Sequence, residues 1–343
     1  MSKKTIDVYI YSNKNTPSSR LRWINYKDKF EENGYKIRVK EIKKYVKNKF
    51  FLKKNKIEKA DYIIIQKTMI SNRLLKKFQK QCNHLLYDID DSIWLKHTSE
   101  SNALKQNIKY FVKRNLFYKN LEKYDYIISS TEYIKNKIKK YNSNIYIIPT
   151  SPSDKNDYEN NGKIFMDKFI VGWTGTSSNF IYIEKVEEFL KPFFKKFEDT
   201  YLVIISDKKY SSNDKLFNKK IINIPWDKKT EAIYIKNFDI GIMPLEKDEW
   251  TLGKAGFKTI YYMKFKIPSI STDWGYQKTF IKNNVNGFLV NNNYEWEEVL
   301  TNLYNNNKKR KEIGKNGYKT YVKRFETNVI FEKYLNLLKS LED

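Results

Sequence analysis

The sequence contains a single cysteine among 343 residues. Cys82 has no second cysteine for an internal disulfide, which predicts a protein of a reducing compartment. No apolar run approaches the roughly 20 residues that a membrane-spanning helix needs. The short apolar stretch near the start is interrupted by Asp7 and lacks a small-residue cleavage site, so a signal peptide is not expected. Together these absences predict a cytoplasmic protein.

Acidic residues are scarce beside basic ones. The 66 Lys and Arg residues outnumber the 40 Asp and Glu residues, and the formal net charge is +26. Abundant Asn, Ile and Tyr accompany the lysines, which favours a compositional bias spread over solvated faces. Nucleic-acid binding would also explain the charge, but no helix-turn-helix, zinc or RNA-recognition motif and no compact basic stripe is found. We therefore expect no nucleic-acid partner.

An anionic membrane surface is a second partner that would suit the charge. The segment 41–60 combines lysines with Phe50, Phe51 and Leu52. This mixture resembles an interfacial segment, in which apolar side chains enter the headgroup boundary and cations stay outside. The alternative is a solvated pair of helices whose aromatic side chains pack inward. The sequence leaves both interpretations open.

Short β-rich runs alternate with stretches of helical period, which indicates parallel sheets covered by helices. The stretch 149–163 is rich in Pro, Ser, Asn and Asp and predicts a linker. We predict an α/β protein with a Rossmann-like N-terminal domain over 1–150, a Rossmann-like C-terminal domain over 164–326 and a helix over 327–343 that can pack back on the first domain. The expected strands are Ile6–Tyr11, Tyr35–Lys40, Tyr62–Gln66, His84–Asp88, Tyr126–Ser129 and Ile145–Ile148, then Phe169–Gly175, Tyr201–Ser206, Ile221–Trp226, Asp239–Leu245 and Ile267–Thr272.

The stretch Asp239–Val290 is the most informative part of the chain. A buried strand ends near Pro244, a polar loop follows, and a helix is expected from Lys254 or Ala255 through Met263. Lys254 and Lys258 would then share one helical face. A helix start with two lysines favours an anion such as a diphosphate. The alternative is an ordinary amphipathic helix with solvated lysines.

This stretch resembles the donor-binding region of retaining glycosyltransferases of family 4, which have the GT-B fold. The resemblance rests on DIGIMPL, GKAGFKTIYYM, IPSIST and NNVNGFLV in that order, and FIVGWTGTSSN resembles the first strand and loop of the family's donor domain. SSRLRW and YDIDDSIW resemble N-terminal segments of one branch. The resemblance implies two Rossmann-like domains that face each other across a cleft.

The resemblance also implies a set of donor-binding residues. Family members hold the pyrophosphate with an Arg and a Lys near the first loop, where this chain has Trp173 and no obvious basic partner. Lys254 and Lys258 are therefore the candidates for that task. Tyr261 stands where the family commonly has a Glu that binds the ribose hydroxyls. The full predicted donor-binding set is Gly175, Thr176, Ser177, Trp226, Lys254, Lys258, Tyr261 and Gly275.

Asp88, Asp90 and Asp91 follow an apolar run and should lie at a strand end of the first domain. They could bind a metal ion as an Asp-x-Asp motif, bind sugar hydroxyls, or begin a helix. GT-B enzymes usually need no metal, so we expect none, with Asp90 and Asp91 as catalytic residues and Asp88 as an acceptor ligand. Arg20 and Arg22, in a loop after the first strand, are predicted to bind the acceptor as well.

The predicted activity is transfer of a sugar from a nucleotide-diphosphate donor to a glycan or lipid-linked acceptor, with retention and without a cofactor. Family analogy places such a reaction in bacterial surface polysaccharide synthesis, on a cytoplasmic enzyme that sits peripherally on the membrane. A non-catalytic sugar-nucleotide or glycan-binding relative is the alternative, and a basic nucleic-acid-binding protein is a weaker one.

Overall fold

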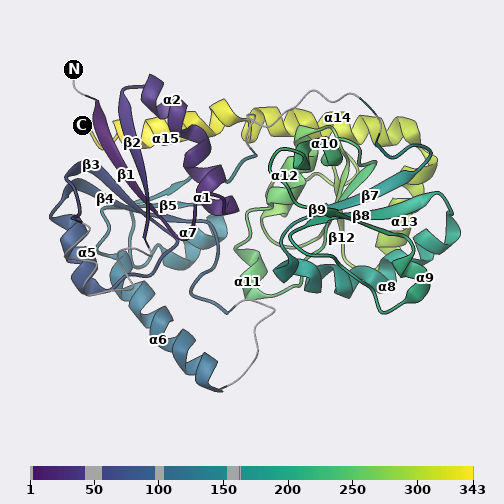
Figure 1. Ribbon diagram of the computed structural model, residues 1–343, viewed down its shortest axis with the longest axis horizontal. Helices are drawn as coiled ribbons and strands as arrows, with labels where there is room; N and C mark the ends of the chain where they lie inside the picture. Colours follow the sequence, from purple (N-terminus) through teal and green to yellow (C-terminus); the bar gives the residue numbers. More distant parts are fainter. Residues whose placement is uncertain (1–2, 43–55, 97–103, 153–161, 163, 343) are drawn as a thin grey trace. The chain divides into compact units, whose positions relative to one another are not determined.

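The computed structural model describes residues 3–42, 56–96, 104–152, 162 and 164–342. The chain divides into two compact units. The first unit comprises Met1–Ser153, Gly253–Ala255 and Thr327–Asp343, and the second comprises Asp154–Leu252 and Gly256–Glu326. Each unit contains one six-stranded parallel sheet with helices on both faces (Figure 1). An α/β fold with two Rossmann-like units is therefore confirmed.

The sheet of the first unit has the strand order β2-β1-β3-β4-β5-β6. Because β1 lies between β2 and β3, the connection that leaves β1 and the connection that leaves β3 cross opposite faces of the sheet. The strands are β1 (Lys4–Ile10), β2 (Tyr35–Glu41), β3 (Ala60–Gln66), β4 (Cys82–Ile89), β5 (Tyr126–Ser129) and β6 (Ile145–Ile147). The helices are α1 (Pro17–Arg22), η1 (Ile24–Tyr26), α2 (Lys27–Glu32), α5 (Asn72–Gln79), α6 (Leu104–Leu121), α7 (Glu132–Ile138) and α15 (Thr327–Lys339).

Alternation along the strands of this unit builds two apolar layers. Ile63 and Ile65 face a layer that contains α5 and α7, whereas Tyr62 and Ile64 face the opposite layer. That opposite layer includes helix α15, whose Tyr334 ring centroid lies 4.9 Å from that of Trp23. The last helix of the chain is therefore part of the core of the first unit, although it follows the second unit in sequence (Figure 1).

The second unit repeats the architecture with the strand order β12-β11-β10-β7-β8-β9. One apolar layer packs α8 and α13 on the sheet, and the other packs α12 on it. The strands are β7 (Phe169–Thr174), β8 (Thr200–Ser206), β9 (Ile221–Pro225), β10 (Ile240–Met243), β11 (Ser269–Thr272) and β12 (Phe288–Val290). The helices are η3 (Ser177–Asn179), α8 (Phe180–Lys196), α9 (Lys215–Asn218), α10 (Glu231–Ile235), α11 (Glu249–Leu252), α12 (Phe257–Lys264), η4 (Tyr276–Thr279), α13 (Asn293–Asn305) and α14 (Asn307–Arg324).

Two local predictions are wrong. The first helix begins at Pro17, so Arg20 and Arg22 lie on a helix and not in the predicted loop. Proline at the first helical position already has the backbone φ angle of a helix, which explains this start. Helix α12 begins at Phe257 because Gly256 adopts a left-handed conformation with φ 65° and forms the N-cap. Lys254 therefore precedes the helix and does not share a helical face with Lys258.

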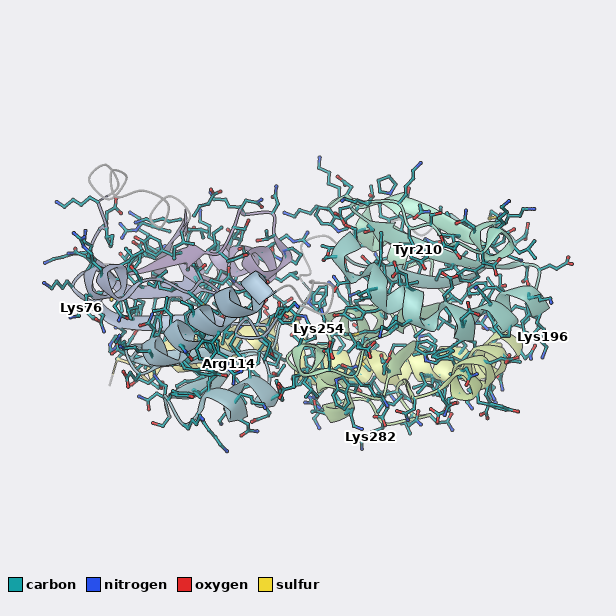
Figure 2. The ribbon with its side chains drawn as sticks, turned by 90° about the horizontal axis from the view of Figure 1, so that it is seen from below. Lys76, Arg114, Lys196, Tyr210, Lys254 and Lys282 are labelled. Carbon is teal, nitrogen blue, oxygen red and sulfur yellow. The ribbon has the colours of Figure 1, made fainter. Side chains whose placement is uncertain are left out.

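Exposed cations occur on many elements. The labelled side chains of Lys76 on α5, Arg114 on α6, Lys196 on α8 and Lys282 are all exposed (Figure 2). This spread over both units agrees with a compositional origin for most of the charge. No helix in the described ranges is both long enough and apolar enough to cross a membrane. Phe50, Phe51 and Leu52 lie outside the described residues, as do residues 153–161 and 163 of the predicted linker.

Candidate functional site

Several of the predicted site residues lie at the carboxyl ends of strands within each unit. In the second unit the chain runs from β7 to β8 on one side and reaches β10 on the other side, so the strand order reverses between β7 and β10. Open parallel sheets bind ligands at such a switch point, because the loops after the two strands diverge and leave room. Gly175 follows β7, and the segment after β10 leads to Lys258.

Gly175 has no room for a side chain. A Cβ atom at this position would lie 2.8 Å from the Trp173 ring and 3.0 Å from the Cε of Lys258. Real Cβ atoms rarely approach other atoms this closely, so the loop requires glycine. The absence of a side chain lets the Trp173 ring and the Lys258 side chain pack directly against the backbone of the loop.

Lys258 is the cation that the structure places beside this loop. It is the second residue of α12, and its Nζ lies 5.1 Å from the centroid of the Trp173 ring. Its side chain is half-buried, and it belongs to the first turn of α12, whose backbone N–H groups have no partner within the helix. Lys254 is also half-buried but is grouped with the first unit. Of the two predicted lysines, Lys258 is therefore the one that the structure brings to Gly175.

Ser177 is held by an aspartate that the sequence analysis did not single out. The Ser177 backbone N–H donates to Asp207 at 2.6 Å, and its hydroxyl donates to the other carboxylate oxygen at 3.0 Å. Burial alone would raise the pKa of Asp207, but these hydrogen bonds and one from Ser206 outweigh it and lower that pKa. A phosphate could bind the Ser177 donors only by displacing the carboxylate. The Thr176 hydroxyl, which accepts from Asn179 at 2.8 Å, is exposed.

Trp226 and Tyr261 belong to one apolar cluster of the second unit. Trp226 is half-buried after β9, and its backbone N–H donates to the Ser206 carbonyl at 2.8 Å. The Tyr261 ring is buried between Phe257 and Phe265, with centroids 5.5 and 5.4 Å away. Burial makes the Tyr261 ring a packing element of α12. Gly275, with φ 74°, begins η4 after β11.

Glu231 is a second acidic residue that the sequence analysis missed. It lies on α10, is buried, and accepts a hydrogen bond from the Thr174 hydroxyl at 2.8 Å. This bond ties α10 to the last residue of β7, directly before Gly175. The sequence gives no signal for this role of Glu231, because the place of the preceding strand, β9, in the sheet cannot be read from the sequence.

In the first unit, Arg22 and Asp88 are bound to each other. The Arg22 Nη2 lies 2.6 Å from Asp88 Oδ1, and both side chains are almost fully buried. Trp23 donates to the same carboxylate at 2.7 Å, while Arg22 also donates to the Ile148 carbonyl at 2.9 Å and to the Thr150 hydroxyl at 3.0 Å. These two predicted acceptor ligands therefore satisfy each other inside the protein. Arg20, on the same helix, is buried too.

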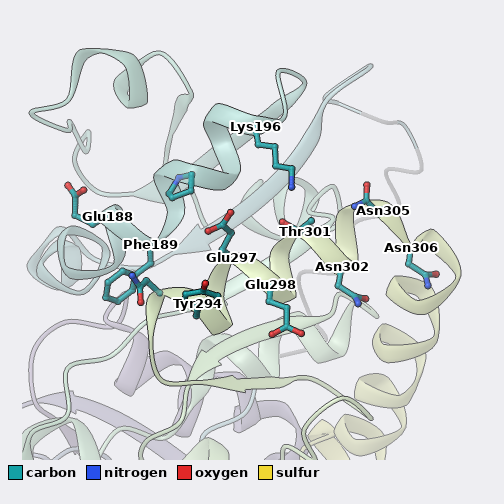
Figure 3. Close-up of a pocket in the computed structure, with 12 residues that line it drawn as sticks. Glu188, Phe189, Lys196, Tyr294, Glu297, Glu298, Thr301, Asn302, Asn305 and Asn306 are labelled. Carbon is teal, nitrogen blue, oxygen red and sulfur yellow. The ribbon is translucent and has the colours of Figure 1, made fainter.

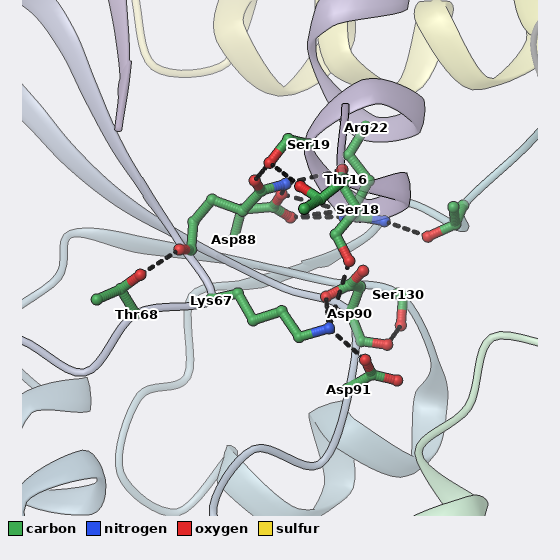
Figure 4. A network of polar contacts seen from close by, with 12 residues as sticks. Thr16, Ser18, Ser19, Arg22, Lys67, Thr68, Asp88, Asp90, Asp91 and Ser130 are labelled. Atoms are coloured by element: carbon green, nitrogen blue, oxygen red, sulfur yellow. Dashed lines mark hydrogen bonds and ion pairs between the residues drawn. The ribbon is translucent and has the colours of Figure 1, made fainter. Parts of the chain in front are cut away.

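Asp90 and Asp91 share a lysine that the sequence analysis did not predict. The Lys67 Nζ lies 3.3 Å from Asp90 Oδ1 and also contacts an oxygen of Asp91 (Figure 4). Lys67 directly follows β3 and has φ 49°, a left-handed conformation that costs a residue with a side chain about 1–3 kcal/mol. Its ammonium also donates to the Ser18 hydroxyl at 3.3 Å. The ends of β3 and β4 and the start of α1 thus meet at the switch point of this sheet.

The charges of this cluster determine how it ionises. Burial would raise the pKa of Asp90, but Lys67 and then Arg22 outweigh it and lower that pKa. Burial would likewise lower the pKa of Lys67, but the two carboxylates raise it. Asp90 is therefore charged at neutral pH, and the Lys67 ammonium is its counter-ion. Ionised carboxylates accept hydrogen bonds and are good ligands for sugar hydroxyls.

The same geometry bears on metal binding. Within the described part of the chain, no three His, Cys, Asp or Glu side chains come together in a way that could hold a metal ion. The Asp88 carboxylate accepts from Arg22 and Trp23, and those of Asp90 and Asp91 contact Lys67. A cation would have to displace these donors.

The second unit carries a family signature. Residues 175–320 match the model of the family Glycosyl transferases group 1. That range begins at Gly175 and includes Lys258. No curated protein matches the sequence.

Solved glycosyltransferase structures share the fold of the whole chain. A glycosyltransferase from Rickettsia africae ESF-5 has a TM-score of 0.71 at 14% identity, with 100% of both chains covered. Anabaena Alr3699/HepE, in complex with UDP and glucose, has a TM-score of 0.68 at 13% identity, with 98% of this chain and 100% of HepE covered. The chain has the GT-B fold. TarM has a TM-score of 0.61 at 20% identity over 84% of this chain, and this chain spans 57% of the length of TarM. A mutant of S. aureus TarM has been solved in a complex that contains UDP.

Proposed function

We propose that this protein is a retaining glycosyltransferase that uses a nucleotide-diphosphate sugar. The observation that carries the proposal is the pair Gly175 and Lys258, which meet at the switch point of the sheet in the unit that matches the family model. A glycine-containing loop beside a half-buried ammonium suits a diphosphate, part of whose negative charge the lysine would offset. The match of residues 175–320 to the group 1 model and the GT-B fold support the same proposal.

The proposed chemistry is a front-face substitution at the anomeric carbon. The acceptor hydroxyl oxygen forms the new bond to that carbon, the bond to the diphosphate oxygen breaks, and the acceptor proton passes to a diphosphate oxygen. No protein nucleophile takes part, so catalysis rests on positioning and on stabilising charge that develops on the leaving group. Lys258 is the residue proposed for that second task. Asp90 and Asp91 are proposed to bind sugar hydroxyls, with Lys67 holding both carboxylates in place.

The identity of the donor is tested first with UDP, because HepE and TarM bind UDP in their solved complexes. A nucleotide at about 100 times its Kd stabilises a protein by ~2.7 kcal/mol, which raises the melting temperature of a unit of this size by roughly 5–10 °C. The expected result is a shift with at least one of UDP, GDP and ADP and none with the matching nucleosides. Equal effects of nucleoside and nucleotide would contradict a diphosphate site.

A non-catalytic sugar-nucleotide-binding relative is the second candidate. The buried Tyr261, which stands where family members commonly have a ribose-binding Glu, favours it. Donor hydrolysis in the absence of acceptor separates the two. A transferase is expected to release the nucleotide diphosphate slowly from the sugar donor, whereas a binding protein would leave the donor intact.

We also propose that the acceptor is a glycan or a lipid-linked precursor of a bacterial surface polysaccharide, and that excess lysines hold the protein at an anionic membrane. Support comes from the net charge of +26. Binding to anionic vesicles should fall as salt rises and should weaken when Phe50, Phe51 and Leu52 are all replaced by Ser. If the protein did not bind anionic vesicles even at low salt, compositional bias alone would explain the net charge.

A further inference from the structure

The outer face of the second unit contains a hollow of about 920 Å³ between α8 and α13. Small-molecule sites span about 300–1,000 Å³, so a ligand of several rings would fit. Figure 3 shows Phe189 and Lys196 of α8 opposite Tyr294, Glu297 and Thr301 of α13. A second hollow of about 470 Å³ shares Glu298 and Asn302 with the first, so the depression continues along α13.

This hollow is separate from the candidate donor site. Helix α8 starts after the loop that follows β7 and ends at Lys196, so its last turns lead away from the carboxyl edge of the sheet. Phe189 and Lys196 lie in that distal half. None of Gly175, Lys258 and Trp226 lines the hollow.

An exposed aromatic side chain is its most unusual feature. Tyr294 is 83% exposed, which leaves most of a large ring in contact with water. Phe189 and Pro192 add apolar surface on the opposite wall. Sugar rings present apolar C–H faces that stack on aromatic rings, while their hydroxyls need hydrogen-bonding partners around the rim.

The polar lining selects the charge of the ligand. Glu188, Glu297 and Glu298 outnumber the one lysine of the hollow, Lys196, although the whole chain carries a net charge of +26. Carboxylates repel phosphates and uronic acids, which argues against nucleic acid, phospholipid or an anionic glycan. Asparagine amides such as Asn302 and Asn305 both donate and accept, as hydroxyl groups do.

We propose that the hollow between α8 and α13 is a binding site for an uncharged oligosaccharide. Its continuation along α13 suits a chain of sugars better than a single ring. Binding here would keep a glycan attached to the enzyme while the transfer site turns over, a consequence that rests on the proposed function. The binding itself does not depend on it.

The test uses the full chain and three uncharged probes: maltohexaose, cellohexaose and chitohexaose, each compared with its monosaccharide by saturation-transfer NMR and calorimetric titration. At least one hexasaccharide should bind, and Tyr294→Ser should weaken that binding at least tenfold. Leu216→Ser is the matched control, because Leu216 is 73% exposed on the second unit and does not line the hollow. Binding should be the same in the control and the native protein.

Three outcomes would overturn the proposal. These are no binding of any hexasaccharide, binding that Tyr294→Ser leaves unchanged, and binding that UDP abolishes by competition. Sedimentation velocity provides a further check, since a dimer that Tyr294→Ser dissociates would make a second copy the occupant. Nucleotide-induced stabilisation is measured on every variant, so a failed glycan site and a failed transferase assignment give different results.

Discussion

Arg22 and Asp88, which are 66 residues apart in the sequence, form a buried ion pair 2.6 Å long. Through it helix α1 is fastened to β4, and the further bonds of Arg22 reach Ile148 and Thr150 after β6. Buried charges need this degree of pairing, because an unpaired one costs several kcal/mol. The pair therefore holds α1 against β4, close to where Asp90 follows that strand.

Removing one partner of this pair should destabilise the first unit. Asp88→Ala leaves the Arg22 guanidinium buried without its counter-ion, and the expected loss is about 3–5 kcal/mol. Lys27→Ala is the control, because the exposed Lys27–Glu31 pair should contribute under about 0.5 kcal/mol. Hydrogen exchange in rising urea reads the first unit separately from the second. A loss below about 1 kcal/mol for Asp88→Ala would mean that the pair is dispensable for folding and free for an acceptor.

Lys258→Ala should weaken binding of a nucleotide diphosphate by roughly 10- to 100-fold, as expected for a charge-assisted hydrogen bond of about 1.5–3 kcal/mol. Nucleoside binding should not change, because the lysine lies beside the Gly175 loop and not in the apolar cluster around Trp226. Lys254→Ala should have a smaller effect. Lys282→Ala, an exposed lysine of the same unit, is the control. Calorimetric titration of all three variants provides the test. Unchanged affinity of Lys258→Ala for the nucleotide diphosphate would contradict the proposed diphosphate site.

Lys67→Met should make the protein more sensitive to acid. The pKa of Asp90 is lowered in the folded protein, so Asp90 contributes stability at neutral pH that is lost as pH falls below its ordinary value near 4. Without the Lys67 ammonium, burial pushes the pKa of Asp90 upward and the loss begins at a higher pH. Acid unfolding followed by circular dichroism should show a raised midpoint for Lys67→Met. Lys67→Arg keeps the positive charge and should unfold close to the native midpoint, and identical curves for all three proteins would contradict the role of Lys67.

The strands were predictable because each is a short apolar run with its own local signal. Tyr126–Ser129 and Tyr201–Ser206 were located to within a residue on that basis alone. The role of Lys67 was not predictable, because it depends on β3 lying next to β4, and strand order is a non-local property. The start of α12 was misplaced because the left-handed conformation of Gly256 leaves no trace in the helical periodicity. The Gly175 loop was recognised from resemblance, but its contact with Lys258 needed coordinates.

A final prediction concerns metal ions. Asp88 and Asp90, followed directly by Asp91, have the Asp-x-Asp spacing that holds Mg²⁺ or Mn²⁺ in metal-dependent GT-A glycosyltransferases, so the sequence alone left a metal site open. In the structure Arg22 neutralises Asp88, and Lys67 contacts both of the other carboxylates. A divalent ion would have to displace a lysine whose pKa these carboxylates raise. Donor hydrolysis should therefore persist in excess EDTA, and Lys67→Met should be equally indifferent to the chelator. The prediction would be contradicted if EDTA abolished turnover and Mn²⁺ restored it in the native protein but not in Asp90→Asn. The aspartate cluster would then be a metal site, and Lys67 would occupy it only in the absence of the ion.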